Sequence, residues 1–258
     1  MLLHAAETGE GERPIVLLHG LFGSAQNFGA LQRRLGEAAR VIALDLRNHG
    51  DSPHADTMRY PEMARDVVET LRALRGLPCR LLGHSMGGKV AMQVALQSGG
   101  EVERLLVADI APVRYPPAFR GFADAMQAVP LRPGLTRAAA SAALADAIPD
   151  AAIRSFLLQN MRFGPQPAWR IGLDRIAAAL PGIEGWEAPD AAPFAGPVLF
   201  VGGARSDYIQ PQHRPAIRAL FPQAQIVALK DAGHWLHADN PDGFLRLVAA
   251  FFGVRLAG

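Results

Sequence analysis

The strongest chemical signal in the sequence is a serine placed between two glycines, in Gly83-His84-Ser85-Met86-Gly87. This segment matches the pattern G-x-S-x-G, which holds a nucleophilic serine on a tight turn between a strand and a helix. An apolar run at 80–82 precedes the motif, and helical spacing follows it at 86–97. We therefore expect the Ser85 hydroxyl to project from the carboxyl edge of a sheet as a nucleophile for acyl transfer.

A serine hydroxyl is a weak nucleophile at its ordinary pKa, so the site needs a neighbouring base. His234 follows the last predicted strand, which brings it to the same sheet edge as Ser85, and we predict it to be that base. His237 is the nearest rival and is interpreted as the start of a surface segment. His19 is expected to support the geometry of its loop instead of transferring protons.

The base in turn needs a carboxylate that orients its ring and stabilises the imidazolium. Asp207 follows the apolar run 198–201, and Asp109 ends the run 105–108. Both positions lie at carboxyl ends of predicted strands, and both give the chain order serine, aspartate, histidine. We favour Asp207 as the acid and keep Asp109 as the alternative, with the second aspartate tuning or replacing the first.

Acyl transfer also requires donors for the negative oxygen of the intermediate. The backbone N–H of Met86 is one expected donor, and that of Leu21, in the loop 19–23, is the other. We expect four aromatic side chains to contact the substrate: Phe22, Phe119, Phe122 and Trp235. For each aromatic residue of the segment 111–196, packing between helices is the simpler alternative.

Short apolar runs alternate with helical spacing along most of the chain. The predicted strands are 15–18, 41–44, 80–82, 105–108, 198–201 and 226–229, and the predicted helices are 25–37, 60–75, 86–97, 211–221 and 241–252. Strands separated by helices imply right-handed crossovers and a mostly parallel sheet with helices on its faces. The fold class is therefore α/β.

The alternation stops between the fourth and fifth of the long core strands. Residues 111–196 are rich in alanine, proline and glycine, and they predict several short helices without a strong strand. A connection of this length is too long for an ordinary loop. We expect a core made of residues 1–110 and 197–258, with 111–196 inserted between two sheet strands as a helical cap.

Composition narrows the class of protein further. Half of the 258 residues are hydrophobic and 19% are charged, so the chain can bury a large core. The net charge is only +2 and the arginines are scattered, which does not predict nucleic-acid binding. No apolar run is long enough to span a bilayer, no secretory signal is visible, and the single cysteine, Cys79, excludes an intrachain disulfide. We expect a cytoplasmic protein without membrane association.

No cofactor or metal is expected, because one cysteine cannot build a cysteine zinc cage. The loop 19–23 also lacks the G-x-G-x-x-G spacing of a dinucleotide site. The expected partner is a small-molecule ester or thioester substrate, and the sequence says nothing of the oligomeric state.

Together these motifs resemble the α/β-hydrolase superfamily, and within it the YbfF-type bacterial esterases and the group of abhydrolase-domain-containing protein 11. The segments that carry the closer resemblance are 19–24, 47–50, 83–89, 109–113 and 233–235. The resemblance implies an α/β-hydrolase fold and ester hydrolysis, with acyl-CoA thioesters as a further candidate substrate. It also implies that the acid follows the strand after the motif helix, which maps onto Asp109.

We therefore expect a serine hydrolase that cleaves carboxylic esters through a Ser-His-Asp triad and an acyl-enzyme. Two alternatives stay open. A cofactor-free perhydrolase of the haloperoxidase type uses the same triad, and a non-catalytic ligand-binding homologue would keep the fold without turnover.

Overall fold

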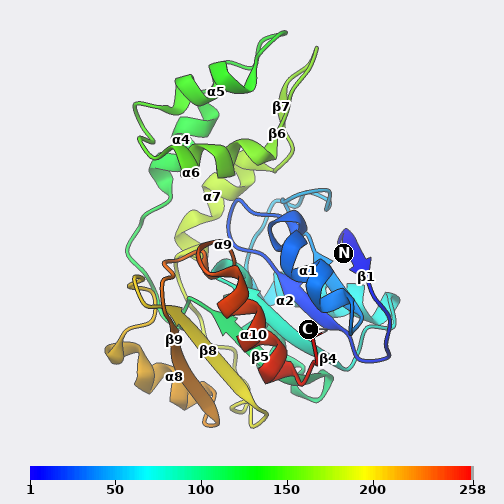
Figure 1. Cartoon of the computed structure of the whole chain (residues 1–258). Helices are drawn as coiled ribbons and strands as arrows, with labels where there is room; N and C mark the ends of the chain where they lie inside the picture. The colour runs from blue at the N-terminus through cyan, green and yellow to red at the C-terminus, as the bar shows by residue number, and fades with distance from the viewer. Residues whose placement is uncertain (257–258) are drawn as a thin grey trace.

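The computed structural model describes residues 1–256, and seven strands in it form one twisted sheet in the order β1-β3-β2-β4-β5-β8-β9 (Figure 1). Only β1 runs antiparallel to its neighbour, so the carboxyl ends of the other six strands meet at one edge. The strands of this sheet are β1 Ala5–Thr8, β2 Ile15–Leu18, β3 Val41–Leu44, β4 Cys79–His84, β5 Val102–Ala108, β8 Val198–Gly203 and β9 Ala224–Leu229.

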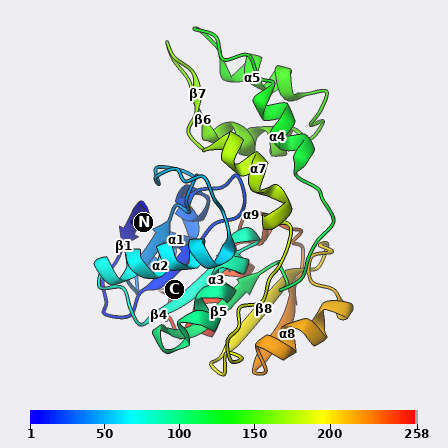
Figure 2. The ribbon, with the colours of Figure 1, turned by 180° about the vertical axis from the view of Figure 1, so that it is seen from behind.

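Helices cover both faces of the sheet, as the two opposite views show (Figures 1 and 2). One face packs against α1 Gly29–Gly36 and α10 Pro241–Phe252, and the other against α2 Tyr60–Ala73, α3 Met86–Gln97 and α8 Arg214–Leu220. Strands β2, β3 and β4 are almost fully buried, because both of their faces lie under helices. The α/β fold predicted from the alternating runs is therefore confirmed.

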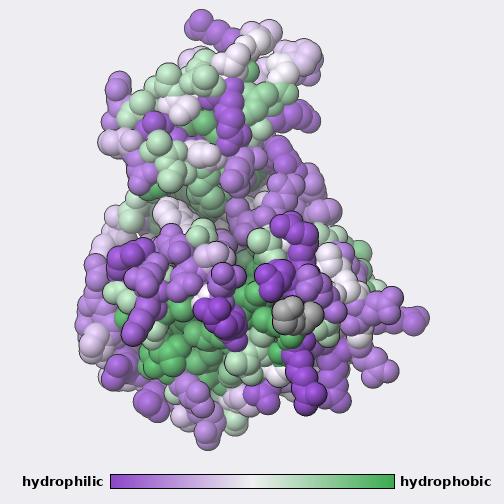
Figure 3. Space-filling model, in the orientation of Figure 1, coloured by the Kyte–Doolittle hydropathy of each residue, from purple (hydrophilic) through white to green (hydrophobic). Residues whose placement is uncertain are grey.

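The middle of the chain inserts a helical segment between β5 and β8. It contains α4 Arg120–Gln127, α5 Arg137–Leu144, α6 Ala151–Leu157, α7 Leu173–Ile183 and a small hairpin of β6 Met161–Arg162 and β7 Ala168–Trp169. We call this segment the cap, because it stands over the carboxyl edge of the sheet (Figure 1) and forms a separate lobe in the space-filling view (Figure 3). The predicted helical insertion is confirmed.

The remaining short elements complete the description. They are the 3-10 helices η1 Ala25–Phe28, η2 Gly99–Glu101, η3 Leu158–Asn160 and η4 Pro211–His213, and the short helix α9 Leu236–Asp239. Sequence patterns missed β1 and the β6–β7 hairpin. Strand β1 is a half-exposed edge strand without a continuous apolar run, and β6 and β7 have only two residues each. Within residues 1–256, no helix is both long and apolar enough to cross a bilayer.

The two ends of the cap meet at Glu184, just after α7. The backbone N–H of Tyr115, in the irregular segment that leaves the core after β5, donates to the Glu184 carbonyl at 2.9 Å. The Glu184 carboxylate oxygen Oε1 accepts from the N–H groups of Ala118 at 2.7 Å and Phe119 at 3.1 Å. The base of the cap is therefore closed by hydrogen bonds to a single residue.

A buried lysine ties this base to helix α3. Lys89 Nζ donates to the carbonyl of Gly185 at 2.5 Å and lies 5.0 Å from the ring centre of Tyr115. Its pKa falls from 10.5 to about 7, first because burial disfavours the ammonium and then because Arg114 repels it, whereas Glu184 acts in the opposite direction. The clamp between core and cap thus contains a group that changes charge near neutral pH.

This lysine predicts how the stability of the protein depends on pH. Between about pH 7 and 10.5 the unfolded chain binds a proton that folded Lys89 has lost, so this group makes the free energy of unfolding rise with pH. We expect Lys89→Met to remove that rise. Denaturant unfolding of the wild type and the variant at several pH values in this window gives the free energy of unfolding of each protein. The difference between the two values isolates Lys89, because the other titrating groups contribute equally to both proteins. A difference in free energy that stays constant with pH contradicts the prediction.

Candidate active site

Ser85 occupies a sharp turn between β4 and α3. Its backbone has φ 53° and ψ −121°, a left-handed conformation that side-chain-bearing residues rarely adopt. The turn is possible because Gly83 and Gly87, two residues before and after Ser85, lack side chains. A Cβ on Gly83 would lie 2.1 Å from the carbonyl oxygen of Gly87, and a Cβ on Gly87 would lie 2.4 Å from those of Leu18 and His19. The predicted strand-turn-helix context of the motif is therefore present.

Three side chains from three loops form one line of hydrogen bonds. His234 Nε2 lies 3.0 Å from Ser85 Oγ, and His234 Nδ1 lies 2.7 Å from Asp109 Oδ2. The carboxylate can only accept, so Nδ1 carries the proton and Nε2 is free to accept from the serine hydroxyl. Asp109 is fully buried, whereas His234 keeps part of its ring accessible.

The preference for Asp207 as the partner of His234 disagrees with this geometry. Asp207 lies on an exposed turn after β8, and within residues 1–256 its side chain makes no hydrogen bond or ion pair with the histidine. Asp109 takes the position because β5 is adjacent to β4, and because a left-handed backbone at φ 50° turns its carboxylate toward the histidine. Asp109, the acid implied by the resemblance to the YbfF-type esterases, is the aspartate that contacts His234 in the structure.

Two further groups hold the Asp109 carboxylate. The N–H of Gly203 donates to Oδ1 at 3.0 Å, and the Ser206 hydroxyl makes a short hydrogen bond to Oδ2. Sequence reasoning singled out this segment for Asp207 but missed Ser206, one residue earlier. A hydroxyl beside a strand end is a weak signal, since serine is common in turns.

The loop that carries the expected oxyanion donor is cross-linked to the loop after β3. His19 Nε2 accepts from the Leu46 N–H at 3.0 Å, and His49 Nε2 accepts from the Phe22 N–H at 3.1 Å. Burial keeps both rings neutral: it lowers the pKa of His19, and it lowers that of His49 to about 3. These two hydrogen bonds anchor the loop at His19 and at Phe22, on either side of Leu21.

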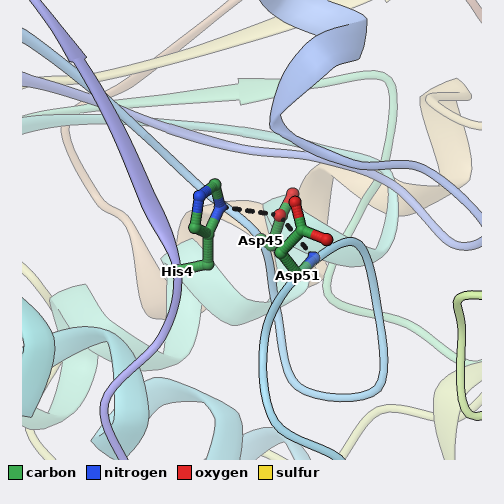
Figure 4. A group of neighbouring side chains, drawn as sticks. All are labelled: His4, Asp45 and Asp51. Carbon is green, nitrogen blue, oxygen red and sulfur yellow. Dashed lines mark hydrogen bonds and ion pairs between the residues drawn. The ribbon is translucent and has the colours of Figure 1, made fainter.

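The loop after β3 is itself held by Asp45, which Figure 4 shows beside His4 and Asp51. Asp45 Oδ1 accepts from the Ala25 N–H at 2.7 Å, and Oδ2 accepts from the Asp51 N–H and from His4 Nδ1, both at 2.9 Å. Within residues 1–256, this is the one cluster whose ligand atoms are close enough to hold a metal ion. Because N–H donors already occupy both oxygens of Asp45, we interpret the cluster as structural: it links the loop after β3 to Ala25 and His4.

An apolar cavity opens at Ser85 between the core and the cap. Core loops contribute Phe22, Phe28, Trp235 and His234, and the cap contributes Phe119, Phe122, Ile153, Phe156 and Leu157. The four aromatic residues predicted to contact substrate therefore lie around one cavity that contains both Ser85 and His234. Phe156, within α6, lines the same cavity.

His237 does not begin a surface segment. It lines the same cavity, and its ring packs at 5.0 Å from Phe28 and 5.3 Å from His84. Burial, followed by the charge of His234, lowers the pKa of His237 to about 4. His84 donates from Nε2 to the carbonyl of His234 at 2.7 Å, which fixes the backbone of that residue.

The comparisons with known proteins agree with this arrangement. The model of the alpha/beta hydrolase family matches residues 15–247. The chain belongs to the alpha/beta hydrolase family. The hydrolase is 43% identical over 246 residues to the sn-1-specific diacylglycerol lipase ABHD11 of Mus musculus, covering 92% of this chain and 80% of the relative.

Two further comparisons point the same way. The hydrolase is 38% identical over 248 residues to esterase YbfF of Escherichia coli K12, with 95% of each chain covered. A solved structure described as a marine microorganism esterase superposes with a TM-score of 0.94 at 34% identity, covering 97% of this chain and 99% of that one. The hydrolase is thus of the carboxylesterase and lipase type.

Exchanging either aspartate for asparagine tests which one serves the histidine. We expect Asp109→Asn to lower kcat of the hydrolase by roughly 10³–10⁴-fold, because an amide can force the wrong tautomer on His234. Asp207→Asn should change kcat less than about twofold, since its exposed side chain does not contact His234. Steady-state kinetics on a p-nitrophenyl ester measures both, with circular dichroism to check folding. Equal losses in the two variants would contradict the assignment.

Proposed function

We propose that this hydrolase cleaves carboxylic esters with an apolar acyl group, through a covalent acyl-enzyme on Ser85. The observation that carries the proposal is the unbroken line of hydrogen bonds from Ser85 through His234 to the buried Asp109. A serine, a histidine and a buried carboxylate in this order form the arrangement that activates a hydroxyl for attack on a carbonyl.

In the first half of the reaction, Ser85 Oγ attacks the ester carbonyl carbon while its proton passes to His234 Nε2. The carbonyl oxygen becomes negative and accepts hydrogen bonds from the backbone N–H groups of Leu21 and Met86. One such donor contributes about 3–4 kcal/mol to lowering the barrier. The intermediate then collapses, the bond to the alcohol oxygen breaks, and His234 gives its proton to the departing alcohol.

In the second half, a water molecule replaces the alcohol. His234 Nε2 takes a proton from the water, and the resulting nucleophile attacks the acyl-serine carbonyl. Collapse returns the proton to Ser85 Oγ and releases the carboxylic acid. Asp109 stays ionised throughout and stabilises the imidazolium formed in each half.

The cavity supports an apolar acyl group as the substrate class. Nine of its lining side chains are large and hydrophobic: Leu21, Phe22, Phe28, Phe119, Phe122, Ile153, Phe156, Leu157 and Trp235. Burying an alkyl chain among them is favourable by about 0.8 kcal/mol for each methylene group. The relatives reported above, a diacylglycerol lipase and an esterase, fit the same class. A thioester presents the same carbonyl to the same groups, so acyl-CoA remains part of the proposal.

Covalent labelling tests the nucleophile directly. We expect a fluorophosphonate probe to modify the folded protein at Ser85 and to leave Ser85→Ala unmodified, because only an activated serine attacks phosphorus at a useful rate. Mass spectrometry of the intact protein and of its peptides gives the site. A folded wild-type protein that stays unlabelled would identify a ligand-binding homologue without turnover.

Chain length tests the acyl cavity. With p-nitrophenyl esters we expect kcat/KM to rise from acetate to about hexanoate, since each buried methylene adds binding energy that the transition state retains. The matching series of acyl-CoA thioesters shows whether the thiol leaving group is accepted. A flat profile with chain length contradicts the apolar cavity but leaves ester hydrolysis itself standing.

A further inference from the structure

One side chain of the cap binds the loop 19–23, which we call the oxyanion loop because it carries the expected donor Leu21. Asn160 Nδ2 donates to the carbonyl oxygen of Phe22 at 2.6 Å, although 138 positions separate the two residues in sequence. Asn160 is the last residue of η3, which directly follows α6, and only 5% of its surface is exposed. A buried amide of the cap therefore holds the backbone of a loop beside Ser85.

The orientation of this amide is fixed within the cap. Nδ2 also donates to the carbonyl of Leu157 at 3.2 Å, so the nitrogen of the amide faces two carbonyl oxygens. The backbone carbonyl of Asn160 accepts from the Arg170 N–H at 2.7 Å. Both the side chain and the backbone of Asn160 are thus anchored in the cap, and the contact with Phe22 ties the oxyanion loop to the position of η3.

Phe22 is a residue that needs such support. It is the third residue of a turn closed by the hydrogen bond from the Gly23 N–H to the Gly20 carbonyl at 3.0 Å, and its φ is 58°. A positive φ at this position is typical of a type II turn and favours glycine, so a phenylalanine there is strained. The commoner type I turn would relieve the strain by rotating the peptide bond between Leu21 and Phe22.

Two contacts oppose that rotation, one at each polar group of the Phe22 backbone. His49 Nε2 accepts from the Phe22 N–H at 3.1 Å, and Asn160 donates to the Phe22 carbonyl. The histidine belongs to the core and the asparagine to the cap. The strained turn is therefore held from both parts of the molecule.

The same turn presents Leu21 to the reaction. Leu21 is buried, yet its N–H makes no hydrogen bond within residues 1–256. The turn also lies against the nucleophile, since a Cβ on Gly20 would lie 3.2 Å from the Cβ of Ser85. A buried N–H without a partner is rare, and this one is the second donor that the mechanism requires. Because a donor must lie about 2.7–3.1 Å from the oxyanion, a small shift of the turn removes its effect.

We propose that Asn160 is a positioning residue of the oxyanion hole, supplied by the cap. Asn160 keeps Phe22 in its left-handed conformation, and the turn then directs the Leu21 N–H toward the negative oxygen of the intermediate. The proposal rests on the esterase function proposed above. The cap therefore contributes to the chemical step in addition to enclosing the acyl group.

Two variants test this role in steady-state kinetics. Asn160→Ala removes the amide, and Asn160→Leu removes the donor while keeping a similar side-chain volume. We expect kcat on p-nitrophenyl hexanoate to fall by about 10- to 100-fold in both variants with KM within about threefold, because the oxyanion forms only during the reaction. Exhaustive labelling with the fluorophosphonate probe counts the active molecules, so kcat refers to folded protein. An Asn160→Leu protein with wild-type kcat overturns the proposal.

Gln159 provides the matched control, because it is the preceding residue of η3 and also joins the cap to the core. Its Oε1 accepts from Asn27 Nδ2 at 3.1 Å, in an exposed contact outside the oxyanion loop. Gln159→Ala should change kcat and KM by less than about twofold. A loss as large as that of Asn160→Ala would show that any contact between cap and core has this effect, which contradicts a specific role for Asn160.

A pair of inhibitors distinguishes oxyanion positioning from a change in cavity shape. When a trifluoromethyl ketone with a pentyl chain binds, Ser85 Oγ bonds to the carbonyl carbon, its proton passes to His234, and the carbonyl oxygen becomes negative. Methyl pentyl ketone fills the same cavity without this adduct. We expect Asn160→Leu to raise the inhibition constant of the trifluoromethyl ketone by about 10- to 100-fold and that of the methyl ketone by less than about threefold. Equal increases for both ketones overturn the proposal.

The outcomes also separate this proposal from the esterase function. If the folded wild-type protein neither hydrolyses the hexanoate ester nor reacts with the fluorophosphonate, the esterase function fails, and the role of Asn160 fails with it. If the wild type hydrolyses the ester and both Asn160 variants match its kcat, the role of Asn160 alone fails.

Discussion

The structure depends on holding one strained residue, Ser85, above the edge of the sheet. Its left-handed backbone is maintained by the strand before it and the helix after it, through hydrogen bonds from the Ser85 N–H to Ala108 and from the Gly88 N–H to Ser85. Phe22 and Asp109 have left-handed backbones as well, so three strained residues surround the same site. Such conformations cost of order 1–3 kcal/mol each, and they persist because the buried β2, β4 and β5 determine the path of the chain.

The polar groups around this edge are preorganised by neutral rings. His19, His49 and His84 are buried, and each hydrogen-bonds the backbone of a loop at the site. Burial lowers the pKa of all three, so they stay uncharged and leave Asp109 as the charged partner of His234. Protonation of His19 or His49 would break a loop contact, because Nε2 could no longer accept from an N–H. Fixed dipoles of this kind favour a transition state without reorganising during the reaction.

Much of the fold and of the candidate site could be predicted from the sequence, because the patterns that indicate them lie within short segments of the chain. Ser85 and the strand and helix around it follow from a motif and two periodic runs, and His234 follows from its place after the last strand. The choice between Asp109 and Asp207 could not, because both end a strand and only the order of strands in the sheet separates them. Ser206 was missed, and His237 was wrongly assigned to a surface segment, for a related reason. Their roles come from contacts between segments about a hundred residues or more apart in the sequence, which periodicity does not record. Ser206 contacts Asp109, and His237 packs against His84.

The closed base of the cap has a consequence for how the chain tolerates change. Tyr115 and Glu184 lie within one hydrogen bond of each other although 68 residues separate them in sequence. With respect to the sheet, the segment between Tyr115 and Glu184 behaves as a loop whose two ends are held together by this hydrogen bond. Loop-closure entropy grows only with the logarithm of length, so doubling the segment would cost about 0.6 kcal/mol. The strands must keep their register, whereas the cap can change its length at little cost to the sheet, and the cavity residues of the cap can therefore vary without disturbing the core.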